Sequence, residues 1–497
     1  MQPTPDFSAF RAAYEAGEAQ LVWLTLPADL ETPVSVLLKL AADRPNSFLL
    51  ESVEGGAVRG RYSFVGLAPD VVWRCTGDRA EINRNALANA GAFVPEAAKP
   101  LDSLRALIDE SRVAIPDGLP PMAAGLVGYM GYDTVRLVEA IPAGNPDLLG
   151  VPDGLFVRPT LIAVFDTIAD TLTLVTPVRP AAGTSPEAAY AAAAARLEAA
   201  LADVGDALPA PRGAEPEAPP APQSNMTRDA FKAMVEKAKE YILAGDIFQV
   251  VLSQRFRIPF ALPPFALYRA LRRTNPSPFM FYLNFGGFQV VGASPEILVR
   301  LRNGTVTIRP IAGTAPRGAT KAEDARLAAE LIADPKELAE HLMLLDLGRN
   351  DVGRVAEVGS VKVTEKMVIE YYSHVMHIVS NVDGRIREDR DAMDALMAGF
   401  PAGTVSGAPK VRAMEIIEEL EPVKRCVYAG CIGYISGNGD MDTCIALRTA
   451  VIKDGQMYVQ AGGGIVADSD PDKEFQESCN KARALLRAAE IAPRYAR

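Results

Sequence analysis

The sequence predicts an α+β fold in which antiparallel β-sheets form a sandwich-like core flanked by helices, with an N-terminal lobe and a larger C-terminal lobe. Three observations predict it. Strand-like runs cluster, and helices interrupt them irregularly instead of alternating with them. The 497 residues exceed the size at which one hydrophobic core usually keeps growing. A Pro/Ala-rich stretch divides the chain, which gives a lobe at residues 1–180, a helix and linker at 181–224, and a domain at 225–497.

The first half contains one clear hairpin signal and one clear helix. Leu161–Phe165 and Thr171–Val175 are strand-like runs on either side of a turn, which favours antiparallel pairing. Ser185 opens an Ala-rich helix that runs to about Gly205. The Pro/Ala/Glu stretch at 207–223 buries little apolar surface, so it is predicted to be an exposed linker.

The second half opens with a helix and a two-sided strand. Thr227 is a candidate N-cap, and Gly245 is expected to stop the helix that follows. Ile247–Ile258 alternates apolar residues with Gln249, Ser253, Arg255 and Arg257, which predicts a strand with one face over a polar cleft. Further strands are predicted at Gln289–Gly292, Ile297–Arg302, Val306–Arg309, Val427–Ser436, Thr443–Ile452 and Met457–Gln460.

Composition restricts the class of protein. A hydrophobic content of 49% with 23% charged residues describes an ordinary globular protein. The net charge of −11 without a basic stripe argues against nucleic-acid binding. The start of the chain lacks the features of a signal peptide, and no apolar run approaches a membrane span. Five cysteines without CxxC spacing favour a reduced cytoplasm, and three histidines argue against a histidine-rich metal centre.

Two predicted helix starts carry the same pair of glutamates. Each begins with Asp-Pro, at Asp334 and Asp470, which suits an N-cap followed by the first helical position. Glu337 with Glu340, and Glu474 with Glu477, stand three residues apart and share a helical face. If the helices face each other, four carboxylates converge on a site that suits Mg²⁺ better than Zn²⁺. Solvated helix starts, with Glu337 in a capping box, are the alternative.

Glycine-rich turns and two arginines are the next candidates. The turns at Gly313-Thr314, Gly403–Lys410 and Ala461–Gly464 lack the P-loop and dinucleotide-binding patterns, so they offer exposed backbone N–H groups that suit carboxylates. Glycines that only form turns are the alternative. Arg309 and Arg448 lie on predicted strands, where each needs a carboxylate partner from the protein or from a ligand.

Motifs across the C-terminal half resemble the chorismate-utilising enzyme family. The resemblance rests on Gly292–Glu296, Arg309–Thr314, Glu340–Asp351, the Thr404–Lys410 turn, Asp442–Ile445 and Asn480–Arg483. The N-terminal half matches more weakly, at Leu49–Ser52 and Arg61–Phe64. The resemblance implies the fold of that family and chorismate as the substrate.

Two positions indicate the branch of the family. Relatives that add water to chorismate have Lys where this chain has Gln249, and Gln is not a general base at neutral pH. Relatives that make aminodeoxychorismate often have a nucleophilic Lys where this chain has Ala312. The resemblance therefore implies a lyase that adds ammonia at C2 and releases pyruvate to form anthranilate, the first step of tryptophan synthesis. An aminodeoxychorismate-forming enzyme and a non-catalytic tryptophan-binding regulator are the alternatives.

The resemblance also implies roles for individual residues. Glu340 and Glu477 would hold Mg²⁺, with Glu337 and Glu474 assisting through water. Glu296 would donate a proton, His377 would assist pyruvate elimination, and Thr404 and Lys481 would support them. The expected substrate contacts are Gly313, Thr314, Tyr434, Arg448, Gly462, Gly463 and Gly464. Glu296 as a surface residue and His377 as a core histidine are the alternatives for these two.

A partner and an inhibitor complete the expectations. No Gly-x-Cys-x-Gly elbow is present, so a separate glutamine amidotransferase subunit is expected to supply ammonia. The resemblance places a tryptophan inhibitor site at Ser52, Pro278, Phe279 and Met280. Relatives often have Tyr at the Phe279 position, and a plain turn is the alternative reading of Asn275–Pro278.

Overall fold

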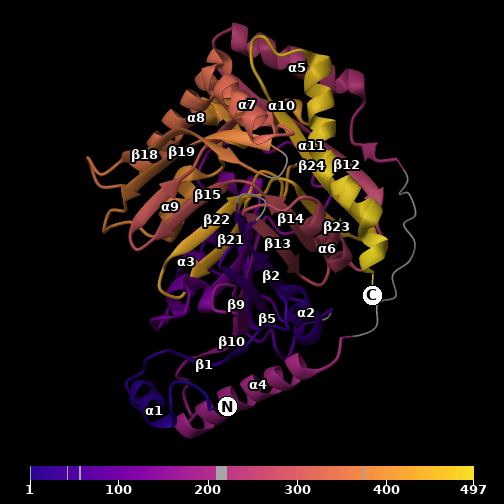
Figure 1. Ribbon diagram of the computed structural model, residues 1–497. Coiled ribbons are helices and arrows are strands. Elements are labelled where there is room, and N and C mark those ends of the chain that lie inside the picture. Colours follow the sequence, from indigo (N-terminus) through magenta and orange to yellow (C-terminus); the bar gives the residue numbers. More distant parts are fainter. Residues whose placement is uncertain (1, 42, 55–57, 209–220, 373–374, 497) are drawn as a thin grey trace.

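The computed structural model describes residues 2–41, 43–54, 58–208, 221–372 and 375–496. Part of the predicted linker, 209–220, and His374 lie outside these residues. Every β-ladder in the described part of the chain is antiparallel, and helices flank the sheets (Figure 1). The α+β prediction is therefore confirmed.

The helices of the described residues flank the sheets (Figure 1). Their bounds are α1 (Phe7–Glu15), α2 (Pro33–Leu40), α3 (Pro100–Glu110), α4 (Pro186–Gly205), α5 (Arg228–Leu243), α6 (Pro264–Thr274), α7 (Lys321–Ala333), α8 (Pro335–Gly353), α9 (Ala392–Gly399), α10 (Lys410–Leu420) and α11 (Pro471–Ile491). Short 3₁₀ helices lie at η1 (Pro121–Ala123), η2 (Tyr132–Leu137), η3 (Gly403–Val405) and η4 (Ala492–Tyr495). None of the described helices is long and apolar enough to cross a bilayer.

Two arms of strands diverge from β9 (Gly154–Asp166). The first arm continues through β5 (Tyr62–Thr76), β2 (Ser47–Glu51), β13 (Phe279–Asn284), β14 (Gln289–Ser294), β23 (Thr449–Lys453), β24 (Gln456–Ile465), β12 (Gln249–Pro259) and β20 (Gly407–Ala408). The second arm continues through β8 (Gly125–Met130), β21 (Cys431–Ser436), β22 (Met441–Ile445), β15 (Ile297–Arg302), β16 (Thr305–Ile308) and β19 (Val375–Arg385), which also pairs with β17 (Ile311–Pro316) and β18 (Lys362–Tyr371).

Shorter strands extend the edges of these arms. The edge strands are β10 (Thr171–Val178) and β1 (Gln20–Pro27) beside β9, β6 (Arg79–Asn83) and β7 (Val94–Pro95) beside β5, and β11 (Gln223–Ser224) beside β12. A separate two-stranded sheet joins β3 (Val53–Glu54) to β4 (Val58–Arg59). The predicted hairpin is confirmed, because β9 pairs with β10 across the turn from Asp166 to Thr171.

The two halves of the chain share their sheets. β2 of the first half pairs with β13 of the second, and β8 pairs with β21. A cluster of buried apolar side chains from both arms, including Phe48, Tyr129 and Phe281, fills the space between them. The sandwich core is therefore built jointly by both lobes, and the three domain boundaries stay a prediction.

Helices seal the outer faces of the two arms. The first arm and its edge strands carry α1, α2, α3, α4, α5, α6, α10 and α11, and the second arm carries α7, α8 and α9. The helix starts at Asp334 and Asp470 are confirmed, because each side chain accepts hydrogen bonds from backbone N–H groups of the first turn. Ser185 and Thr227 cap α4 and α5 as expected, and Gly245 follows α5 with φ of +84°.

Three sequence expectations about strands are wrong. The predicted strand Val427–Ser436 begins only at Cys431, because residues 426–430 form a turn. Thr443–Ile452 is not one strand, because the chain leaves β22 at Ile445 and resumes in β23 at Thr449. Arg448 in this break has φ of +47°, outside the β region. Phe248, expected on the apolar side of the predicted strand Ile247–Ile258, precedes β12 and is 71% exposed.

Candidate active site

Glu296 lies between β14 and β15 and is buried, with an exposed fraction of 4%. Thr404 Oγ1 donates a hydrogen bond to Glu296 Oε1 over 2.9 Å, and the Ile311 N–H lies 3.4 Å from the same oxygen. Burial raises the pKa of Glu296 from 4.5 to about 8, although the Thr404 bond acts in the opposite direction. The carboxyl is therefore mostly protonated at pH 7, and the surface-residue alternative for Glu296 is wrong.

His377 lies on β19 beside Gly313 and Thr314 of β17. Its Nδ1 is 3.2 Å from the Gly313 carbonyl oxygen and 3.0 Å from Thr314 Oγ1. Because a carbonyl only accepts, we assign the hydrogen to Nδ1, which leaves Nε2 as an acceptor. Burial lowers the pKa of His377 to about 4, so the ring is neutral at pH 7. The three predicted site residues therefore lie together.

Arg448 lies in the turn between β22 and β23. Among the described residues its guanidinium has no hydrogen bond or ion pair, and burial lowers its pKa. It is close enough to His377 to lower the pKa of that ring. Arg309, by contrast, pairs with Glu365 over 2.8 Å and Glu370 over 2.6 Å, so its partners are structural. Arg448 is thus the arginine that suits a ligand carboxylate.

The four glutamates approach one region from α8 and α11. Gln249 Nε2 donates to Glu340 Oε1 over 3.3 Å, and a Cβ placed on Gly464 would lie 2.2 Å from the same amide nitrogen. A Cβ on the neighbouring Gly463 would lie 3.0 Å from Glu474 Oε2 and 3.5 Å from Glu477 Oε1. Gln249 and the Gly463-Gly464 backbone therefore connect the two glutamate pairs.

In each pair, the neighbouring carboxylate adds to the effect of burial on the pKa of one glutamate. Burial raises the pKa of Glu337, with Glu340 as the next contribution. Burial likewise raises the pKa of Glu474, and Glu477 adds to the effect. The described residues contain no group of three or more His, Cys, Asp or Glu side chains placed to hold a metal ion. Since Mg²⁺ usually binds one or two carboxylates together with water and substrate oxygens, this all-oxygen set fits Mg²⁺ that binds with the substrate.

Lys481 and the glycines of β24 line the same region. Lys481 Nζ donates to the Gly462 carbonyl oxygen over 3.0 Å and pairs with Glu477 over 2.7 Å. A Cβ on Gly462 would meet the Leu252 carbonyl oxygen at 2.1 Å, so this glycine is needed for strand packing. Gly463 is the glycine whose missing side chain leaves room beside the carboxylates.

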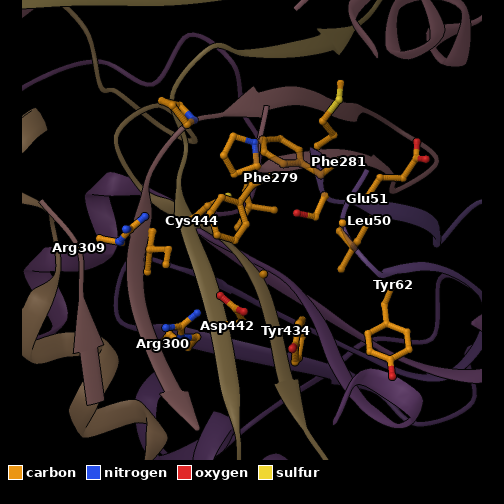
Figure 2. Close-up of a pocket in the computed structure, with 18 of the residues that line it drawn as sticks. Leu50, Glu51, Tyr62, Phe279, Phe281, Arg300, Arg309, Tyr434, Asp442 and Cys444 are labelled. Atoms are coloured by element: carbon orange, nitrogen blue, oxygen red, sulfur yellow. The ribbon is translucent and has the colours of Figure 1, made fainter. Parts of the chain in front are cut away.

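Pro295 and Ile297, the residues before and after Glu296 in the chain, line a cavity of about 780 Å³. Ser52, Pro278, Phe279 and Met280, the four predicted inhibitor contacts, all line this cavity. Figure 2 shows Phe279 among the lining residues. Tyr434, predicted as a substrate contact, lines it as well, whereas Arg448 is not among its lining residues. The structure thus groups Tyr434 with the predicted inhibitor residues.

The cavity also contains charged groups to which the sequence analysis assigned no role. Arg300, Arg302 and Asp442 line it, and Arg302 lies 3.3 Å from Asp442 Oδ2. Burial raises the pKa of Asp442 to about 6, and its Oδ1 has no hydrogen-bond partner among the described residues. Two arginines at alternate positions of the apolar β15 were the available signal, because residues i and i+2 of a strand share a face.

Comparison with known proteins identifies the family. The sequence profile described as chorismate binding enzyme matches residues 46–487. An anthranilate synthase component 1 of Cereibacter sphaeroides is 61% identical over 99% of this chain and 98% of its own length. One of Pseudomonas putida is 53% identical over 94% of both chains.

Solved structures give the same result. Anthranilate synthase component I from Streptococcus pneumoniae is 37% identical over 93% of this chain and 99% of its own, with a TM-score of 0.77. MenF, the menaquinone-specific isochorismate synthase of Escherichia coli, shares the fold at 20% identity, covering 95% of both chains with a TM-score of 0.72. The chain therefore belongs to the chorismate-binding enzyme family, and within it to the anthranilate synthase component 1 proteins.

Proposed function

We propose that the chain is the large subunit of an anthranilate synthase, a lyase that converts chorismate and ammonia to anthranilate and pyruvate in the first step of L-tryptophan biosynthesis. The observation that carries the mechanism is Glu296, a buried carboxyl that keeps its proton at neutral pH. The relatives named anthranilate synthase component 1, at up to 61% identity over nearly the full chain, support this product.

Amination is the first step of the proposed reaction. Arg448 binds a carboxylate of chorismate, and the backbone at Gly313 and Thr314 positions the ring. Ammonia forms the N–C2 bond while the C4–O bond breaks, and Glu296 donates its proton so that the hydroxyl leaves as water. The new ammonium group then loses one proton, which balances the proton that Glu296 gave.

Elimination is the second step. His377 accepts the C2 proton at Nε2, the C3–O bond breaks, and the ring becomes aromatic. The released enolpyruvate takes a proton at its methylene carbon and becomes pyruvate. Gln249 plays no part as a base, because its amide cannot take a proton at neutral pH, so water at this position stays unactivated. Its observed contact with Glu340 makes it a positioning group.

Magnesium is the cofactor we propose. Glu340 and Glu477 would hold it, with Glu337 and Glu474 assisting through water. Bound Mg²⁺ would supply positive charge that neutralises the ring carboxylate of the substrate. The raised pKa values of Glu337 and Glu474 support this assignment, since both report negative charge crowded in a partly buried place.

A separate glutamine amidotransferase subunit is the ammonia source we propose. Glutaminase chemistry needs a cysteine with a lowered pKa, yet burial raises the pKa of all five cysteines of this chain. The name component 1, carried by the relatives, supports a partner chain. None of the five thiols is in a disulfide, which favours the reducing cytoplasm as the location.

Feedback inhibition by tryptophan is the regulation we propose, with the effector in the 780 Å³ cavity. Its volume lies within the roughly 300–1,000 Å³ of small-molecule sites. Phe279, Tyr434 and Pro278 offer apolar walls, and the buried Asp442 oxygen without a partner offers an acceptor. Apolar walls beside charged groups suit an aromatic amino acid.

Product identity tests the proposal. The purified chain is incubated with chorismate, Mg²⁺ and an ammonium salt, and the fluorescence of anthranilate is followed together with released pyruvate. Anthranilate formation with ammonium, and none with glutamine unless a partner is added, is the expected result. A non-fluorescent amino product would indicate aminodeoxychorismate formation, and no chorismate consumption would indicate a non-catalytic regulator.

A further inference from the structure

Arg425 is a buried guanidinium that joins separate parts of the chain. It follows α10, and its side chain is 1% exposed. Nη1 donates to the Val405 carbonyl oxygen and Nη2 to the Val251 carbonyl oxygen, each over 2.6 Å. Nε and Nη2 also bind the two oxygens of Glu421, over 2.9 and 2.6 Å. The Arg425 side chain thus connects η3 to β12, and Glu421 neutralises its charge.

The η3 turn carries Thr404, the residue that hydrogen-bonds Glu296. Its carbonyl group at Val405 points to Arg425, and the next carbonyl, of Ser406, accepts the Val251 N–H over 2.9 Å. Arg425 therefore holds the carbonyl group of Val405, the residue that follows Thr404. Without it, the Val405 carbonyl oxygen would lose its charged donor in the protein interior, and the turn would lose the bond that fixes its position.

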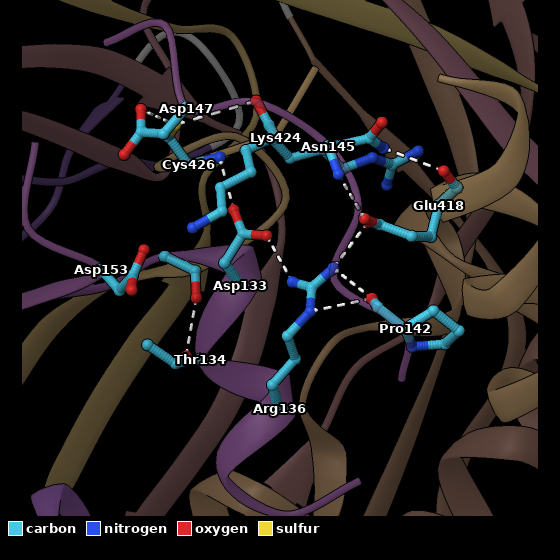
Figure 3. A network of polar contacts seen from close by, with 12 residues as sticks. Asp133, Thr134, Arg136, Pro142, Asn145, Asp147, Asp153, Glu418, Lys424 and Cys426 are labelled. Atoms are coloured by element: carbon cyan, nitrogen blue, oxygen red, sulfur yellow. Dashed lines mark hydrogen bonds and ion pairs between the residues drawn. The ribbon is translucent and has the colours of Figure 1, made fainter. Parts of the chain in front are cut away.

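The N-terminal half fixes Arg425 in turn. The ring of Tyr132 lies under the guanidinium, with 4.7 Å from Cζ to the ring centroid. The Tyr132 N–H donates to the Cys426 carbonyl oxygen over 2.8 Å. Asp133 Oδ2 accepts the Cys426 N–H over 2.9 Å, within the network of Figure 3. Two residues of η2 thus bind the backbone N–H and the carbonyl group of Cys426, the residue after Arg425.

We propose that Arg425 is a positioning residue for the catalytic acid, because it fixes the η3 turn so that Thr404 hydrogen-bonds Glu296, with its own position set by Tyr132 and Asp133 of the N-terminal half. The inference rests on the proposed function only in naming Glu296 the acid. The structural part of the proposal is that a substitution at Arg425 changes the environment of Glu296 by moving Thr404.

The groups that face Glu296 allow an effect of Arg425 through Thr404 to be distinguished from a direct effect of its charge. Besides Thr404 and the Ile311 N–H, Tyr372 is near enough for Glu296 to raise the pKa of its phenol. Asp351, paired with Lys410 over 2.9 Å, shares a small cavity of about 20 Å³ with Glu296. Arg425 contributes no direct shift to the Glu296 pKa. Arg425→Lys keeps the positive charge and leaves these neighbours in place, so a change at Glu296 has to pass through the turn.

The experiment measures the pKa of Glu296 without turnover. The carboxyl band of the full chain is followed by infrared spectroscopy against pH, and the spectrum of Glu296→Gln is subtracted. Thr404→Val removes the hydrogen bond that favours the carboxylate, so the pKa of Glu296 rises by about one unit. Arg425→Lys is expected to raise it by a similar amount, and the double variant is expected to add nothing further, because both changes remove one contact.

A matched buried arginine provides the control. Arg158 is also buried and pairs with Asp70 over 2.8 Å and Glu110 over 2.9 Å, and none of its described partners belongs to the η3 turn. Arg158→Lys is expected to leave the pKa of Glu296 unchanged even where it lowers thermal stability. If Arg425→Lys does not fold, Tyr132→Leu, which removes the supporting ring, replaces it.

Three results would overturn the proposal: an unchanged pKa in the variant that folds, an additive shift in the double variant, or an equal shift in Arg158→Lys. The infrared titration does not require catalysis. Failure of the chain to form anthranilate would therefore count against the proposed function and leave this test intact.

Discussion

Thr404 and Glu296, 108 residues apart in the chain, are joined by a hydrogen bond of 2.9 Å between Oγ1 and Oε1. Burial holds the proton on Glu296, and the threonine hydroxyl stabilises the carboxylate that remains after the proton is given. Because the two effects oppose each other, the pKa of about 8 lies close to neutrality, where a general acid works best.

The stability of the protein should depend on pH through Glu296. Its pKa is about 8 in the folded chain and 4.5 without burial, so between these values the folded state binds more protons than the unfolded state. As pH rises through that window, this group alone should therefore lower the free energy of unfolding by about 1.4 kcal/mol per pH unit. Glu296→Gln removes this dependence, and we expect its stability relative to the parent chain to rise with pH in denaturant titrations. Parallel pH profiles for the two proteins would contradict the burial argument.

Metal dependence should follow the glutamate pairs. Glu340→Ala and Glu477→Ala should abolish Mg²⁺-dependent turnover, because each removes a proposed ligand. Glu474→Gln should raise the Mg²⁺ concentration for half-maximal activity by roughly 10- to 100-fold, the usual effect of an outer ligand. The measurement is the initial rate against Mg²⁺ concentration. Glu490→Ala, on the same helix but paired with Arg487 in solvent, is the control. Near-normal turnover in Glu340→Ala or Glu477→Ala would refute the site.

A substitution at Tyr434 should change inhibition by tryptophan and leave the binding of chorismate unchanged. Its hydroxyl lies 3.4 Å from Arg302 in the 780 Å³ cavity with Ser52 and Phe279. Tyr434→Phe loses that hydroxyl, so the tryptophan concentration for half-inhibition should change about fivefold, the value of one hydrogen bond near 1 kcal/mol. The KM for chorismate should stay unchanged in the same assays. A raised KM with unaltered inhibition would instead support the substrate contact predicted from the sequence.

Tyr132 offers a test of the contact between the two halves of the chain. Its hydroxyl is buried without a hydrogen-bond partner among the described residues, while its ring lies against Arg425. Tyr132→Phe removes the unsatisfied hydroxyl and keeps the ring, so chemical denaturation should show a protein of equal or slightly higher stability, by up to about 1 kcal/mol. A loss of more than about 2 kcal/mol would mean that the hydroxyl has a bound water or another partner.

Local chemistry made several elements predictable. Asp334, Asp470, Ser185 and Thr227 are N-caps because a short polar side chain before a helix pairs with its free N–H groups, and this can be recognised without any tertiary contact. The β9–β10 hairpin is equally local. Glu296 and His377 were singled out by another route, the resemblance to the chorismate-utilising enzyme family.

Long-range pairing was not predictable in the same way. The strand pairs β2–β13 and β8–β21 join strands that are far apart in the chain. The alternation of apolar and polar residues within one strand does not determine which strand it pairs with. Thr443–Ile452 is uniformly strand-like, yet the chain turns at Arg448. The burial that sets the pKa of Glu296 comes from such packing, so the sequence indicated its role but not its protonation state.

The pH dependence of ammonia-dependent anthranilate formation, at constant free ammonia, tests the central claim most directly. We expect kcat/KM to fall as pH rises through about 8, because the acid form of Glu296 is lost. Glu296→Gln should lower kcat on the order of 10²- to 10⁴-fold and abolish that limb. A Glu296→Gln enzyme with near-normal kcat and the same basic limb would contradict the account.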